Sequence, residues 1–446
     1  MARRNRRQKR QEPRRVTIES MSHEGRGIAH VNGKTVFVFG ALEGETVLMQ
    51  VQKSSRKFDQ ATTLEVFEAS PLRVAPRCAA YQVCGGCSLQ HLDNDDQVAF
   101  KQQSLLDMMA HAGIEVGELL EPLRAAAWGY RDKARLGVKY VAKKERVLVG
   151  FRERNTPFIA DMQRCEVLLP AVGERLGELS RLVGELDARA QIPQIEVAAD
   201  GERVQLVFRH LQPLSSADRE RLSDFARREG FDLLLQPGGP DTVTPLYPER
   251  SELSLRPDYD HDIRIGFNAL DFAQVHRDIN RQMVAQAMRL LELEAEHRVL
   301  DLFCGLGNFT LPLARRCASV TGVEVDEPML LRARAAAQAN GIDNTEYYCA
   351  DLTRPDPGSA WMRQRYDRIL LDPPRSGALE MAQSIADFDA ERIVYVSCQP
   401  SSLVRDAAII CAQGYRLSAL GVMDMFPQTS HVESMALFER VSRRSK

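Results

Sequence analysis

The stretch that decides the fold is VLDLFCGLGNFTLPLA, residues 299–314. An apolar strand runs into the turn GLGN and then into a helix, which brings flexible backbone and unpaired helix amides close to a bound ligand. Strand and helix patterns alternate from about residue 270 to the end of the chain. This alternation predicts an α/β fold, with a doubly wound, mostly parallel (Rossmann-like) sheet over residues 267–446.

Acidic residues follow two further strands of this region. Glu324 ends a strand nineteen residues after Gly305, where a carboxylate can accept the hydroxyls of a ribose. Asp351 follows the next strand and is placed to bind an adenine amino group. A nicotinamide dinucleotide, or a tight turn without a ligand, would also fit such a pattern. The GLGN turn is not G-x-G-x-x-G, and its spacing to the acids favours S-adenosylmethionine.

Three reactive side chains lie further along the same region. Asp372 follows the strand in DRILLDPPRSG, Cys398 ends RIVYVSC, and Glu433 lies in HVESMALF. A thiol, a carboxylate and a methyl donor together indicate methylation at carbon 5 of uracil, because thiolate addition to carbon 6 activates carbon 5 and a base then removes its proton. A free thiol has a pKa of about 8.5, so Cys398 needs an electropositive neighbour. The alternative is an inert, buried thiol.

Four motifs carry a resemblance to a known family. DLFCGLGNF (301–309), DPPRSG (372–377), VSCQP (396–400) and HVE (431–433) resemble those of the RNA uracil-5-methyltransferases. The resemblance implies that Cys398 is the nucleophile and Glu433 the base. It also implies cofactor contacts at Gln274, Phe303, Asn308, Glu324, Asp351 and Asp372. The family often has Asn where this chain has His276 and Gln399.

Short strand patterns broken by glycines predict a small β-barrel over residues 14–69. Lys53, Arg56 and Lys57 suit a barrel that grips a nucleic-acid backbone. The segment resembles a TRAM (OB-like) domain, which is an RNA-binding module. Residues 1–15 carry eight Lys or Arg and one Glu. Residues 1–13 are therefore interpreted as a basic, flexible tail, either solvated or lying along phosphates.

The pattern of residues 70–266 predicts an α+β middle domain, which contains a group of cysteines with metal-ligand spacing. Cys78, Cys84 and Cys87 cluster, and Cys165 lies far downstream. Four thiolates suit a [4Fe–4S] cluster or zinc. The set resembles the iron–sulfur cysteines of the ribosomal family members, and this implies a 23S rRNA uridine as the substrate. Because a uracil must leave its stack to reach Cys398, we expect this uridine to lie in a loop or to be flipped out.

The composition is that of a nearly neutral protein, and two alternative functions can be weighed against the motifs. Lys and Arg number 59 against 61 Asp and Glu, and no apolar run is long enough for a membrane helix, so we expect a cytoplasmic protein without a membrane or an implied protein partner. An RNA cytosine-5-methyltransferase would carry a cysteine directly after the DPP prolines, where this chain has Arg375. A non-enzymatic iron–sulfur RNA-binding protein would not need Cys398 and Glu433.

Overall fold

The computed structural model describes residues 12–441, which form two compact units. The first contains the described chain up to Lys101, with Arg152–Ala160 and Pro427–Ser430. The second contains Gln102–Phe151, Asp161–Phe426 and the chain from His431 onward. The basic tail predicted for residues 1–13 lies almost wholly outside the described residues. Within the described part, no helix is both long and apolar enough to cross a membrane.

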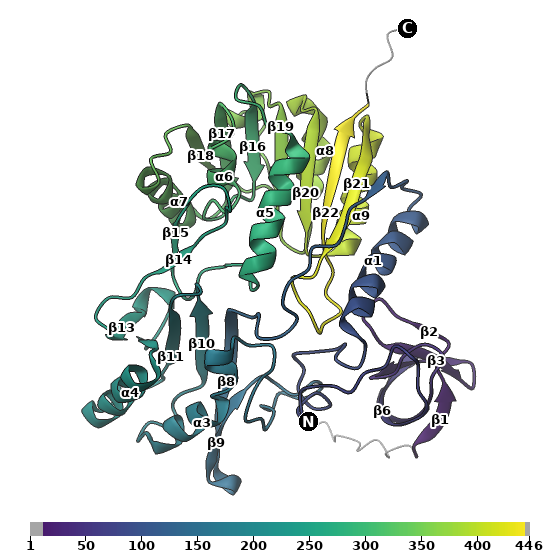
Figure 1. Ribbon diagram of the computed structural model, residues 1–446, viewed down its shortest axis with the longest axis vertical. Helices are drawn as coiled ribbons and strands as arrows, with labels where there is room; N and C mark the ends of the chain where they lie inside the picture. Colours follow the sequence, from purple (N-terminus) through teal and green to yellow (C-terminus); the bar gives the residue numbers. More distant parts are fainter. Residues whose placement is uncertain (1–11, 442–446) are drawn as a thin grey trace, which may run out of the picture. The chain divides into compact units, whose positions relative to one another are not determined.

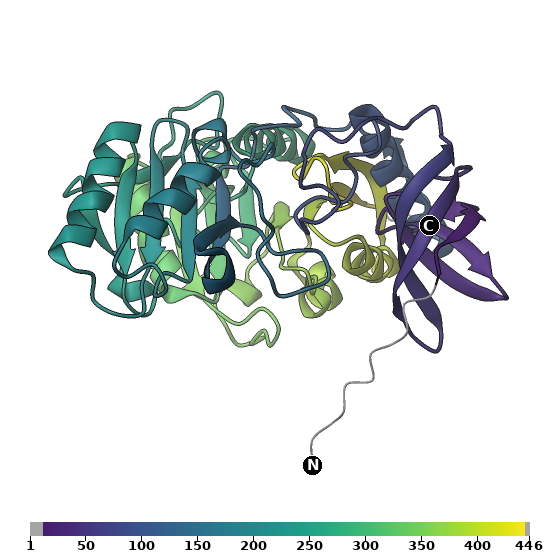
Figure 2. The ribbon, with the colours of Figure 1, turned by 90° about the horizontal axis from the view of Figure 1, so that it is seen from below.

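The first unit is built on a six-stranded sheet in the order β1-β5-β6-β4-β3-β2. Its strands are β1 (Arg14–Thr17), β2 (Ser20–Met21), β3 (Gly27–Val31), β4 (Lys34–Phe39), β5 (Thr46–Ser54) and β6 (Phe58–Glu68). The two end strands, β1 and β2, are separated only by Ile18 and Glu19, and the Glu19 N–H donates to the Ile28 carbonyl at 2.8 Å. The sheet therefore closes into the predicted small barrel (Figure 2). The sequence prediction missed β2 and β3.

The apolar side chains of the barrel point inward because alternate residues of each strand face one side. Ile18, Val36, Val38, Val47 and Met49 are at most 1% exposed and form its core. Helix α1 (Asn94–His111) then leads from the first unit into the second.

The second unit begins with a mixed sheet in the order β13-β12-β11-β10-β8-β9. Its strands are β8 (Lys133–Val141), β9 (Arg146–Gly150), β10 (Gln194–Ala199), β11 (Val204–Arg209), β12 (Asp232–Gln236) and β13 (Thr244–Tyr247). Its helices are α2 (Pro170–Gly173), α3 (Leu176–Glu185) and α4 (Ser216–Glu229). Strands β10 and β11 form an antiparallel hairpin around Asp200-Gly201. A small pair, β14 (Leu253–Leu255) and β15 (Ile265–Phe267), follows.

The C-terminal region of this unit holds an eight-stranded sheet in the order β18-β17-β16-β19-β20-β22-β21-β7 (Figure 1). Its strands are β7 (Glu118–Leu119), β16 (Arg298–Leu302), β17 (Ser319–Glu324), β18 (Thr345–Cys349), β19 (Arg368–Leu371), β20 (Arg392–Ser397), β21 (Tyr415–Met423) and β22 (Glu433–Arg440). Its helices are α5 (Arg277–Leu291), α6 (Thr310–Ala314), α7 (Glu327–Ala339), α8 (Leu379–Ser384) and α9 (Pro400–Ala412). Strands β16–β20 are mutually parallel, as predicted, and β22 is antiparallel to β20.

The two faces of this sheet are covered by different helices, because successive side chains of a strand alternate. Val394 and Val396 of β20 share a core with Met283 and Ala287 of α5, which crosses the sheet in Figure 1. On the opposite face, the Tyr395 hydroxyl donates to Asp406 of α9 at 2.7 Å. Burial on both sides accounts for the continuous apolar strands that the sequence shows.

Candidate active site

The predicted site residues lie along one edge of the eight-stranded sheet, in the order of its strands. Parallel strands end at the same edge, and ligand sites in such folds occur there. From β18 to β20, the residues at this edge are Asp351, Glu324, the glycine turn, Asp372 and Cys398. Gln274 lies apart, on the segment that precedes α5. The edge therefore combines the predicted cofactor contacts with the predicted nucleophile.

The glycine turn adopts the left-handed backbone that its composition allows. Gly305 and Gly307 have φ angles of 55° and 94°. A Cβ built on Gly305 would meet no atom of the described chain within 4 Å, so open space lies beside it. Phe303 also has a positive φ, 64°, and its N–H donates to the Val323 carbonyl at 2.9 Å. A ligand can therefore approach the turn backbone closely.

Two carboxylates face this turn from the strands beneath it. The Gly305 N–H donates to Glu324 Oε2 at 3.3 Å. Asp301 is fully buried and accepts a hydrogen bond from the Thr310 hydroxyl at 2.5 Å, but its Oδ1 has no partner among residues 12–441. Burial raises the pKa of Asp301 to about 7. An unpaired buried acceptor and open space at the turn fit a ligand that offers a donor or a positive charge.

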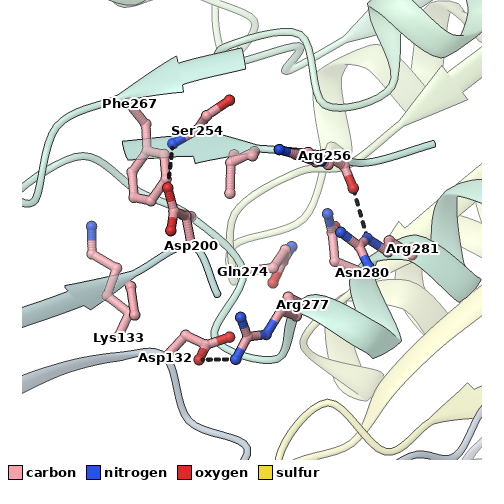
Figure 3. A pocket seen from close by; sticks show the side chains of 13 residues that line it. Asp132, Lys133, Asp200, Ser254, Arg256, Phe267, Gln274, Arg277, Asn280 and Arg281 are labelled. Carbon is pink, nitrogen blue, oxygen red and sulfur yellow. Dashed lines mark hydrogen bonds and ion pairs between the residues drawn. The ribbon is translucent and has the colours of Figure 1, made fainter. Parts of the chain in front are cut away.

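The predicted cofactor residue Asn308 has a partner that the sequence analysis missed. Asn280 of α5 donates to Asn308 Oδ1, and Asn308 donates to Asn280 Oδ1, both at 2.9 Å. Asn280 and Gln274 line a pocket together with Asp132 and Arg277 (Figure 3). One indication of this pair was present in the sequence, namely that Asn280 is a polar residue beside Ile279 on the face of α5 that becomes buried.

Strand pairing brings the two predicted reacting groups together. Strand β22 runs antiparallel to β20 with Ser434 opposite Ser397, so Glu433 and Cys398 are the next residues at the same edge. Burial, followed by the charges of Glu433 and Asp372, raises the pKa of the Cys398 thiol to about 11, whereas Arg375 lowers it. Arg375 is thus the electropositive neighbour, and the carboxylates outweigh it. Burial also raises the pKa of Asp372 to about 7.

The rival base candidate, His431, has a different environment from Glu433. His431 is exposed and its ring lies 5.4 Å from that of Phe426. Glu433 is 7% exposed and acts electrostatically on Cys398. Of the two side chains, Glu433 is the buried one and lies opposite the end of the strand that carries Cys398.

The cysteine loop of the first unit is organised around Arg154. Its guanidinium donates to the carbonyl oxygens of Cys84 and Cys87 at 2.9 and 2.6 Å and lies 3.5 Å from the centre of the Phe39 ring. The Gly86 N–H donates to Cys84 Sγ at 3.4 Å. A partly buried cation and an amide directed at sulfur suit thiolate ligands.

The fourth predicted ligand, Cys165, is buried in the second unit, and its N–H donates to the Gly173 carbonyl at 2.8 Å. Among residues 12–441, no group of three or more His, Cys, Asp or Glu side chains is arranged to hold a metal ion. The metal centre therefore stays a prediction.

Comparison with known proteins gives the chain its family. A methyltransferase-domain profile matches residues 299–371, a tRNA (uracil-5-)-methyltransferase profile matches 358–441, and a TRAM-domain profile matches 7–64. A 23S rRNA (uracil(1939)-C(5))-methyltransferase RlmD of Alcanivorax borkumensis is 48% identical over the full length of both chains. The protein of the same name from Alkalilimnicola ehrlichii is 51% identical over 99% of each chain. The chain belongs to the RlmD family of methyltransferases.

RlmD membership confirms the resemblance inferred from the four motifs, and the TRAM match confirms the interpretation of the barrel. A solved structure agrees with the fold. The tRNA (uracil-54, C5)-methyltransferase of Pyrococcus abyssi, solved with S-adenosyl-L-homocysteine, has a TM-score of 0.73 and is 22% identical. The alignment covers 95% of this chain and all of the archaeal one. At this identity the match supports the Rossmann-like architecture alone.

Proposed function

We propose that this protein transfers a methyl group from S-adenosylmethionine to carbon 5 of a specific uridine in 23S rRNA. The observation that carries the proposal is the meeting of Cys398 and Glu433 at the sheet edge that also holds the open glycine turn. The names of the RlmD relatives specify the same reaction. Bound S-adenosylmethionine supplies an electrophilic methyl group at this edge.

Two side chains of the chain carry the chemistry on the base. The Cys398 thiolate adds to carbon 6 of the uracil, and carbon 5 becomes nucleophilic. Carbon 5 would then take the methyl group as the bond between the methyl carbon and the sulfonium sulfur breaks, and S-adenosylhomocysteine would leave. Glu433 then takes the proton from carbon 5. The bond between sulfur and carbon 6 breaks, the double bond reforms, and the thiolate is released. The buried position of Glu433 beside Cys398 supports these roles.

The cofactor would be held by groups from several strands. Gly305 and Glu324 present a backbone amide and a carboxylate on one side, and Asp372 presents a carboxylate on the other. The full proposed set is Gln274, Phe303, Asn308, Glu324, Asp351 and Asp372. Open space beside Gly305 and the unpaired Asp301 oxygen support a ligand at this place.

We infer that Cys78, Cys84, Cys87 and Cys165 bind a [4Fe–4S] cluster. Support comes from the four free thiols, from the Gly86 amide directed at Cys84, and from the partly buried Arg154 cation, which would offset thiolate charge. The reaction requires no electron transfer, so a structural role for the cluster is the simpler assignment. Zinc is the other metal that this donor set would accept.

The RNA substrate would meet the protein at two places. The barrel, with exposed Lys53, Arg56 and Lys57, would supply phosphate contacts that are independent of sequence. The target uridine must leave its stack, because Cys398 is partly buried and a stacked base cannot reach it. Activity on ribosomal RNA would place the protein in the cytoplasm.

The decisive experiment compares 23S rRNA from a strain lacking the gene with rRNA from the same strain complemented by wild type or Cys398→Ala. We expect one 5-methyluridine, mapped by mass spectrometry, to disappear on deletion and to return only with wild type. Appearance of 5-methylcytidine instead would assign the cytosine reaction. An unchanged rRNA methylation pattern would overturn the proposal.

A further inference from the structure

The segment that carries Gln274 is held from one side by the chain just ahead of β8. The Asp132 N–H donates to the Val275 carbonyl at 2.9 Å. Arg277 Nη2 donates to Asp132 Oδ1 at 3.1 Å (Figure 3). Asp132 thus binds the segment on both sides of His276, once through its backbone and once through its carboxylate.

His276, between these two contacts, is held by the same stretch of chain. Its ring stacks on that of Tyr130, with centroids 4.9 Å apart and an interplanar angle of 16°. Its Nε2–H donates to the Ala126 carbonyl at 3.0 Å. Three consecutive residues, 275–277, are therefore fixed directly after Gln274.

The carboxylate end of the Asp132–Arg277 pair is buried, whereas the Arg277 side chain is 37% exposed. Asp132 is 3% exposed, and its Oδ2 has no partner among the described residues. A Cβ on Gly201 would lie 1.9 Å from Arg277 Nη1, so a larger residue there would displace the guanidinium. A partly buried ion pair of this kind contributes little net stability, because solvent screening on the exposed side and desolvation on the buried side offset the attraction between the charges. Fixing a conformation is the better-supported effect of such a pair.

The fixed segment, residues 275–277, is connected at each end to a residue of the predicted cofactor site or to its partner. Gln274 precedes it and lines the pocket shown in Figure 3, in which the Asp132–Arg277 pair forms part of the wall. Asn280 follows within the first turn of α5 and pairs with Asn308 of the glycine turn. A shift of residues 275–277 would therefore move Gln274 and disturb Asn308.

We propose that Asp132 is a positioning residue for the cofactor site, which acts by fixing residues 275–277 so that Gln274 and Asn308 face S-adenosylmethionine. The proposal rests on the proposed function and assigns to the middle region of the chain a part in cofactor binding. Asp132 touches neither of the reacting groups. Its effect should therefore fall on cofactor affinity and spare the chemical step.

The test compares Asp132→Asn with a matched control, Asp258→Asn, in the full-length protein. Asp258 pairs with Arg316, and its side chain is 4% exposed, as is that of Asp132, but it lies between β14 and β15. Because Asn keeps the shape of Asp132 but removes the charge that Arg277 contacts, we expect Asp132→Asn to raise the Kd for S-adenosylmethionine at least about tenfold in calorimetry. For Asp132→Asn, the KM for RNA and kcat at saturating cofactor should stay at wild-type values. For the control Asp258→Asn, the Kd for S-adenosylmethionine should also stay at its wild-type value.

A double-mutant cycle with Arg277→Gln shows whether Asp132 acts through its partner. The double variant should bind the cofactor no more weakly than the worse single variant. Wild-type affinity in Asp132→Asn, or an equal loss in Asp258→Asn, would overturn the positioning role. Wild-type protein that binds no S-adenosylmethionine at all would instead overturn the proposed function.

Discussion

Asn280 of α5 and Asn308 of the glycine turn exchange two hydrogen bonds, each 2.9 Å long. Asn280 is 5% exposed and Asn308 is partly buried, so the two bonds are shielded from water on the Asn280 side. The pair joins the first helix of the eight-stranded region to the turn that would contact the cofactor. The orientation of Asn308 therefore depends on a residue that lies 28 positions earlier in the chain.

Asn280→Ala removes the protein partner of both amide groups of Asn308, which is partly buried. An intramolecular hydrogen bond typically contributes about 0.5–1.5 kcal/mol, so we expect a lower free energy of unfolding together with weaker S-adenosylmethionine binding. Denaturant unfolding with and without cofactor measures both quantities. Gln282→Ala, on the same helix, removes a more exposed bond to the Arg124 carbonyl and serves as the control. Equal losses in the two variants would argue against a special role for the pair.

Cys398→Ala and Glu433→Gln should fail at different steps. Without the thiol, carbon 5 never becomes nucleophilic, and turnover should be abolished. Without the base, methyl transfer can proceed but the carbon 5 proton stays, and loss of a positioned base typically costs about 100- to 10,000-fold. We therefore expect Glu433→Gln to accumulate a methylated protein–RNA adduct that survives denaturing electrophoresis.

His431→Ala is the control for the Glu433 assignment, because His431 is the other titratable group in the same segment. It should turn over at a rate close to wild type and trap no adduct, since its side chain is exposed. Trapping by His431→Ala with normal turnover by Glu433→Gln would reverse the two roles.

Methylation should speed up as pH rises from neutral. The pKa of Cys398 is raised to about 11, so only the protonated thiol is abundant at pH 7, and the thiolate fraction grows about tenfold per pH unit below the pKa. The measurement is kcat/KM for RNA against pH. Arg375→Gln removes the cation that lowers this pKa, so its rate at a given pH should fall, while Arg375→Lys should retain more activity. A flat profile in wild type would contradict thiolate attack as the pH-dependent step.

Protein purified without air should be brown and should lose its colour on treatment with an iron chelator. Because a metal held by the four proposed cysteines would couple binding to folding, metal removal should also lower the unfolding temperature. Cys165→Ser should reproduce both effects, whereas Cys411→Ser should have neither. Colourless protein with one zinc per chain would rule out the iron–sulfur assignment.

Replacing Lys53, Arg56 and Lys57 of the barrel by Gln should weaken rRNA-fragment binding and flatten its dependence on salt. For every phosphate that is no longer neutralised, the slope of log K against log salt should fall by about 0.7–0.9. S-adenosylmethionine affinity should not change. Gln replacements of Lys139, Lys143 and Arg219, which are exposed in the second unit, provide a control of equal charge. Identical salt slopes for the two triple variants would mean that these barrel cations do not contact the RNA.

Most of the sheet edge could be predicted from the sequence. The glycine turn, Glu324, Asp351, Asp372 and Cys398 each follow an apolar strand, and in a parallel sheet all such strand ends meet at one edge. Local periodicity is sufficient for this prediction because it determines which residues form strands and where each strand stops.

Other relationships depended on the tertiary structure. The sequence places Glu433 and His431 in one segment, and only the Ser397–Ser434 register shows that Glu433 meets Cys398. The contribution of β7 to the far edge of the sheet and the pairing of Asp132 with Arg277 were also not predicted. Sequence alone thus determined the elements and the chemistry at their ends. Pairing between distant residues was decided by backbone register and side-chain packing, which no local pattern encodes.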